Sequence, residues 1–108
     1  MVVIANQTDA ILIIKELVNE YFPESSVFLF GSRARRDFTE DSDFDLMVVT
    51  SNTYENTECR HLKAMVRRQL AKRRIPADII ILSKAQLETN KKITGHIVRQ
   101  VLKEGIPI

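Results

Sequence analysis

The chain has 108 residues, which is enough for one hydrophobic core and too few for two, so we expect a single domain over residues 1–108. Hydrophobic residues form 44% of it and charged residues 28%, a balance that excludes an intrinsically disordered protein. Its net charge of +2 hides an uneven distribution, because residues 60–74 hold seven basic side chains and no acidic one. The sequence has no apolar run of membrane-spanning length, and its one cysteine, Cys59, cannot form an internal disulfide. We therefore expect a cytoplasmic protein that does not enter a membrane.

Helical and strand-like patterns alternate along the chain. Apolar residues at helical spacing, followed by proline or glycine, predict helices. Short runs rich in β-branched and aromatic residues predict strands. The predicted ranges are 9–22, 55–74 and 93–104 for helices and 26–30, 44–50 and 77–82 for strands. This order predicts an α+β fold, in which helices flank a small mixed β-sheet.

The C-terminal third carries two finer expectations. Ser83 and Gln86 have the spacing of a capping box, which predicts a further helix that begins after Ser83. The helix at 93–104 is expected to turn one apolar face toward the core, and Gly105 and Pro107 would end it. That face consists of Ile97, Val98, Val101 and Leu102.

Two aspartates lie one residue apart where the second predicted strand begins. Side chains alternate along a strand, so Asp43 and Asp45 would share a face, with Cα atoms about 6.6 Å apart. Two carboxylates at that distance repel each other unless a positive group lies between them. Mg²⁺ fits this place, because it accepts few carboxylates and keeps positions for water and phosphate oxygens. Asp78 also interrupts an apolar strand, and acids in two such strands suggest one shared cation site.

Three other interpretations of these acids are conceivable from the sequence. An EF-hand calcium loop is excluded, because Leu46 and Asn52 stand where it needs glycine and glutamate. An acidic turn that solubilises the start of the strand would explain Asp41 but not Asp45, which lies inside the apolar run. A carboxylate pair for glycoside hydrolysis has no other support in the sequence.

Gly31 and Ser32 follow the first predicted strand and precede a plausible first helical turn at 33–36. Glycine lets the backbone approach a ligand closely, and free amides at a helix start favour phosphate. Ser32 can add a hydroxyl donor or act as the N-cap of the turn. The pair belongs to neither a Walker A loop nor a G-x-G-x-x-G motif, and Gly-Ser alone is common in turns. Its significance comes from the nearby acids.

Three motifs together resemble the DNA polymerase beta-like nucleotidyltransferase superfamily. In order, they are Phe30-Gly31-Ser32, Asp43-Phe44-Asp45-Leu46 and Ala77-Asp78-Ile79. The resemblance is strongest to the minimal nucleotidyltransferases (MNT) and covers nearly the whole chain. That family commonly has glycine where Arg36 stands here. The resemblance implies the nucleotidyltransferase fold, ATP or another nucleoside triphosphate as donor, and two Mg²⁺ ions.

The resemblance also implies a role for each matched residue. Asp43 and Asp45 would bind both Mg²⁺ ions. Asp78 would hold the metal on the acceptor side and help to deprotonate the acceptor hydroxyl. Nucleotide and phosphate binding would fall to Gly31 and Ser32, with Arg33, Arg35 and Arg36 as candidate helpers.

The resemblance further implies a partner. MNT proteins are typically paired with a helical HEPN protein in toxin–antitoxin systems, where the MNT antitoxin can transfer AMP from ATP to a tyrosine of the toxin. The alternative is a non-catalytic antitoxin or nucleotide-binding module that acts by complex formation only. A nucleic-acid-binding module using residues 60–74 and a homo-oligomer also stay open. The sequence does not fix the acceptor.

Overall fold

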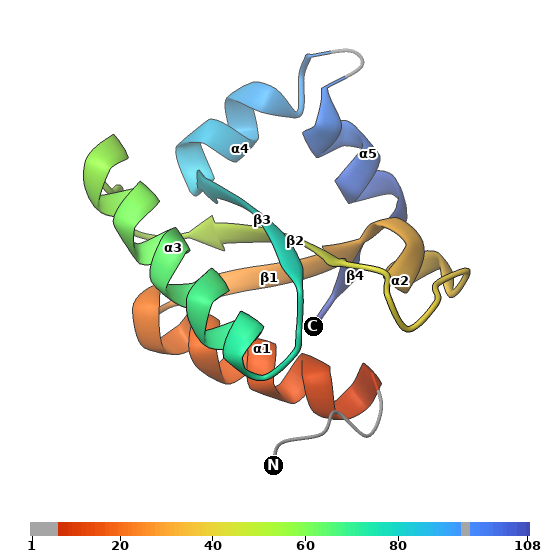
Figure 1. Cartoon of the computed structure of the whole chain (residues 1–108). Helices are drawn as coiled ribbons and strands as arrows, with labels where there is room; N and C mark the ends of the chain where they lie inside the picture. The colour runs from red at the N-terminus through yellow and green to blue at the C-terminus, as the bar shows by residue number, and fades with distance from the viewer. Residues whose placement is uncertain (1–6, 94–95) are drawn as a thin grey trace.

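Helices and strands follow one another along the chain and build one sheet with helices on both faces (Figure 1). The computed structural model describes residues 7–93 and 96–108. In chain order the elements are α1 (Gln7–Tyr21), β1 (Ser25–Phe30), α2 (Gly31–Arg35), β2 (Phe44–Thr50), α3 (Asn56–Lys72), β3 (Ala77–Ser83), α4 (Lys84–Asn90), α5 (Ile97–Glu104) and β4 (Ile106–Pro107). The three longer strands lie within one residue of their predicted ends, and the predicted mixed sheet is confirmed.

The sheet has the strand order β3-β2-β1-β4, so β2 lies inside it and β3 forms one edge. β1 is antiparallel to both β2 and β4, while β2 and β3 are parallel. The register places Asp45 beside Phe30 of β1 and beside Asp78 of β3. Because partners in register project to the same face, the carboxylates of Asp45 and Asp78 share one face of the sheet.

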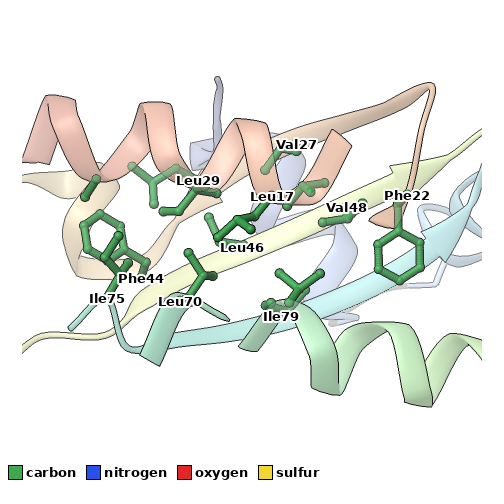
Figure 2. Packing of buried hydrophobic residues seen from close by; sticks show 14 residues of the cluster. Leu17, Phe22, Val27, Leu29, Phe44, Leu46, Val48, Leu70, Ile75 and Ile79 are labelled. Carbon is green, nitrogen blue, oxygen red and sulfur yellow. The ribbon is translucent and has the colours of Figure 1, made fainter. Parts of the chain in front are cut away.

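Each face of the sheet packs against its own pair of helices. On one face, α1 and α3 cover Leu29, Leu46 and Ile79, as Figure 2 shows. On the other face, α5 buries Val98 and Val101 in a smaller cluster that includes Met47 and Val49 of β2. Residues of β2 are therefore buried on both faces, which explains why this strand is an almost unbroken apolar run. Asp45 interrupts that run on the α5 face.

The predicted capping box is confirmed at the start of α4. The backbone amide of Gln86 donates to Ser83 Oγ at 3.2 Å, and the amide of Ser83 donates to Gln86 Oε1 at 2.9 Å. Each partner thus satisfies an amide that the helix leaves free. Along the described residues, every helix is too short or too polar to span a membrane.

The prediction for the C-terminal helix was partly wrong. α5 begins only at Ile97, and His96 Nδ1 caps it by accepting from the Val98 amide at 3.1 Å. Residues 94–95 of the predicted range lie outside the described part. Val98 and Val101 are buried as expected, but Ile97 is 38% exposed and Leu102 is 45% exposed. Ile97 and Leu102 lie at the two edges of the apolar stripe of α5. The sheet covers only the middle of that stripe, so the residues at its edges stay exposed.

Candidate active site

Asp43, Asp45 and Asp78 come together at the end of the sheet where β2 and β3 begin. Asp45 is half-buried in β2, whereas Asp43, just before that strand, and Asp78, in the edge strand β3, are exposed. Burial raises the pKa of Asp45, the charges of Asp78 and then Asp43 raise it further, and the charge of Arg35 opposes them. The three predicted carboxylates therefore act on one another as one cluster.

The donor set of this cluster fits a divalent cation. Neither Asp43 nor Asp78 forms a side-chain hydrogen bond or ion pair with another described residue, so both carboxylates are available. Within residues 7–93 and 96–108, no three His, Cys, Asp or Glu side chains are grouped closely enough to enclose a metal ion. Mg²⁺ does not require such a cage, because it usually takes one or two carboxylates and completes its shell with water and substrate phosphates.

Gly31 is required where β1 meets α2. Its φ is +71°, a left-handed conformation that side chains disfavour. A Cβ atom at this position would also collide with Asp45 Oδ2 and lie 3.0 Å from Asp45 Cγ. Phe30, which precedes the helix, provides no side-chain cap to its first amides. Glycine thus lets an uncapped chain segment lie directly against the Asp45 carboxylate, beside the predicted phosphate contact Ser32.

Arg33 was a predicted phosphate contact, but its side chain is directed elsewhere. It is only 7% exposed, and its guanidinium lies between two aromatic rings, 4.4 Å from the Phe38 centroid and 4.3 Å from the Phe44 centroid. Its Nη2 donates to the Ser42 carbonyl at 2.9 Å, and its Nε donates to the same oxygen at 3.2 Å. Arg33 therefore holds residues 37–43, the loop that leads into Asp43, and has little freedom to reach a phosphate.

Arg35 and Arg36, the other two predicted phosphate contacts, lie on the surface. The Arg35 side chain pairs with Asp37 at 3.3 Å and with Glu104 of α5 at 3.4 Å, and its charge is felt at Asp45. Arg36 ends α2 with φ 66° and ψ 24°, a left-handed conformation. Glycine, which the resemblance leads one to expect at this position, would adopt this conformation without strain.

One feature of this region was missed by the sequence analysis. A cleft of about 450 Å³ opens beside Asp43, and its remaining lining residues are Ala64, Arg67, Arg68, Ala71, Pro76 and Ala77. The first four of these lie at helical spacing i, i+3, i+4 and i+7 on α3. That spacing was readable from the sequence, but only the fold shows that this side of α3 faces the acidic cluster.

The mixed sheet places carboxylates from two neighbouring strands beside a Gly-Ser helix start, an arrangement that suits an enzyme acting on nucleotide phosphates. The sequence model of the family described as "Polymerase beta, Nucleotidyltransferase" matches residues 13–108. The chain belongs to this family and is a nucleotidyltransferase. The resemblance found in its three motifs is confirmed.

A curated relative supports the same family. A protein of Methanocaldococcus jannaschii named "putative protein adenylyltransferase" is 32% identical over 97 residues, which cover 85% of this chain and 90% of the relative. The match thus spans most of both proteins.

Two solved structures share the fold. One is a toxin–antitoxin complex with AMP-PNP, with a TM-score of 0.60 and 19% identity over 94% of this chain and 72% of that one. The other is the tri-AMPylated HEPN toxin of Shewanella oneidensis in complex with its MNT antitoxin, with a TM-score of 0.59 and 18% identity over 94% and 71% of the two chains. At these identities the likeness establishes the fold, and the predicted nucleotidyltransferase fold is confirmed.

Proposed function

We propose that this chain is a Mg²⁺-dependent adenylyltransferase that moves AMP from ATP to a hydroxyl of a partner protein, most simply a tyrosine of a HEPN toxin. The observation that carries the proposal is the carboxylate cluster, in which burial and then the charges of Asp78 and Asp43 raise the pKa of Asp45, beside the glycine that opens α2. Carboxylates this close repel one another unless a cation is bound between them. A nucleoside triphosphate that arrives with Mg²⁺ would supply that cation.

Asp43 and Asp45 would hold the metal ions, which we propose to be two Mg²⁺. When bound, these ions would neutralise phosphate charge and polarise the α-phosphate. The backbone at Gly31 and Ser32 would orient the triphosphate, because the first amides of α2 have no side-chain cap and Gly31 lies beside the Asp45 carboxylate. Arg35, whose charge opposes the rise in the Asp45 pKa, would add positive charge beside the phosphates.

Asp78 would act on the acceptor. It lies in register with Asp45 but on the edge strand, where its exposed carboxylate is open to an incoming protein. The acceptor oxygen would attack the α-phosphorus as the bond to the bridging β-phosphate oxygen breaks and pyrophosphate leaves. Asp78 would take the hydroxyl proton during that attack. The product would be a phosphodiester between AMP and the acceptor.

The comparisons support a partner of this kind. The M. jannaschii relative carries the name of a protein adenylyltransferase, and the Shewanella structure pairs an MNT antitoxin with an AMP-bearing HEPN toxin. Transfer of AMP to a toxin would give the chain an antitoxin role. A purely binding antitoxin would neutralise its partner without adding mass to it, so the two functions are separable by experiment.

The test is intact-mass spectrometry of the HEPN-type protein from the same genome after incubation with the chain and Mg·ATP. We expect a mass increase equal to one or more AMP groups with the wild type. Asp78→Asn should reduce transfer much more than it reduces ATP binding, because Asp78 is assigned to the acceptor. If the wild type adds no mass while Asp78→Asn still neutralises the toxin, the binding-only function is the better account. Transfer that survives in Asp78→Asn would remove Asp78 from the mechanism.

A further inference from the structure

The cleft beside Asp43 is built by one side of α3. Ala64 and Ala71 are small residues one turn before and after a pair of arginines, so they leave a hollow around Arg67 and Arg68. The opposite wall is the start of β3 at Ala77, whose side chain shares the α3 face of the sheet with Ile79. The cleft thus opens on the α3 side of the acidic cluster.

The positive charge in this cleft is not balanced. Arg67 and Arg68 are exposed, and neither forms an ion pair with any residue in the described ranges 7–93 and 96–108. Asp43 is the only acidic residue among those that line the cleft. Two arginines that line a hollow and form no ion pair with another described residue are suited to bind a carboxylate or phosphate brought by a ligand.

The position of the cleft favours the acceptor over the donor. Under the proposed function, the triphosphate lies against Gly31 and Ser32, on the face of the sheet that carries Asp45. The cleft reaches Asp43 from the α3 side, away from Gly31 and Ser32, and ends at Pro76 and Ala77, the two residues that precede Asp78. Because Asp78 is assigned to the acceptor, a charged cleft at this edge of the cluster is placed to hold part of the incoming molecule.

We propose that Arg67 and Arg68 bind an acidic side chain of the acceptor protein, close to the hydroxyl that receives the nucleotide. This inference rests on the proposed function and adds an acceptor preference to it. A protein side chain fits better than a nucleic acid, because none of the residues that line the cleft is aromatic, so the cleft lacks the rings on which successive bases stack. A cleft of about 450 Å³ has room for one or two side chains of an extended segment.

The experiment uses two fluorescent tyrosine peptides that differ only in carrying glutamate or glutamine beside the tyrosine. Binding is measured by anisotropy without ATP and with EDTA, for the wild type, for Arg67→Gln/Arg68→Gln, and for Arg60→Gln/Lys72→Gln. The last variant removes the same charge from exposed positions of α3 outside the cleft. We expect the wild type and this control to bind the glutamate peptide about five- to tenfold more tightly than the glutamine peptide. The cleft variant should lose that preference while its Mg·ATP affinity stays unchanged.

Several outcomes would overturn the inference. An equal preference in the cleft variant and the wild type would show that the arginines do not read the acidic residue. An equal loss in the control would indicate general attraction by the basic helix. Weaker Mg·ATP binding in the cleft variant would assign the cleft to the donor, and tighter binding of a single-stranded RNA than of the peptide would assign it to nucleic acid. Failure of AMP transfer would count against the proposed function alone, because this binding assay contains no ATP.

Discussion

Replacing Arg33 with lysine tests whether this residue supports the loop or contacts phosphate. Lysine keeps the positive charge but loses the planar fork that reaches the Ser42 carbonyl and lies between two rings. Each lost hydrogen bond from a buried charged group is worth about 1 kcal/mol or more, and each lost ring contact about 0.5–1 kcal/mol. We therefore expect Arg33→Lys to lower the free energy of unfolding by about 2–4 kcal/mol.

The assay is urea denaturation in EDTA without nucleotide, so that no phosphate contact contributes. Arg35→Lys is the matched control on the same short helix, because its ion pairs with Asp37 and Glu104 are partly exposed and should be worth about 0.5 kcal/mol or less. An Arg33→Lys variant as stable as the control would refute the structural role. A variant of normal stability with much weaker Mg·ATP binding would instead restore Arg33 as a phosphate contact.

Three further predictions concern the same end of the sheet. Gly31→Ala should lower the free energy of unfolding in urea by about 1–2 kcal/mol from the positive φ alone, and unchanged stability would contradict this strain. The variant should also weaken Mg·ATP binding, because the added Cβ would displace the Asp45 carboxylate. Arg36→Gly should raise the free energy of unfolding by about 1 kcal/mol with no change in Mg·ATP binding by calorimetry, whereas weaker binding would identify Arg36 as a phosphate ligand. The third prediction is a pH dependence. Because the pKa of Asp45 is raised, the folded chain keeps a proton that the unfolded chain has lost, so stability in EDTA should fall as pH rises from the ordinary aspartate pKa through the raised one. Asp45→Asn should remove this slope and stabilise the metal-free chain at neutral pH, and a large drop in its melting temperature would instead mean that Asp45 holds a structural contact.

The acidic cluster was predictable from sequence because a carboxylate inside an apolar strand is a local anomaly. Asp45 and Asp78 each stand out in this way, and strand alternation assigns their faces. The register that places them side by side is set by strand pairing, which the sequence does not display. The burial of Arg33 could not be predicted from the sequence, because it depends on how the loop at 37–43 folds back and places Phe38, together with Phe44 at the start of β2, against the guanidinium.

The C-terminal segment shows a second limit. The spacing of its apolar residues predicts a helix, and α5 is a helix. The same spacing does not show how wide a stripe of that helix the sheet can cover. The exposure of Ile97 and Leu102 could therefore not be predicted. The two-residue strand β4 pairs with β1 and is too short to leave any period in the sequence.

Calorimetric titration of Mg·ATP into the wild type and into the double variant Asp43→Asn/Asp45→Asn tests most directly whether the carboxylate cluster is the active centre. Both substitutions keep the side-chain shape and remove the charge that the cation needs. We predict measurable Mg²⁺-dependent binding to the wild type and at least a tenfold loss in the double variant, about 1.4 kcal/mol or more of binding free energy. The variant should remain folded in EDTA, because the substitutions relieve repulsion at Asp45. A folded double variant that binds Mg·ATP as tightly as the wild type would contradict the assignment.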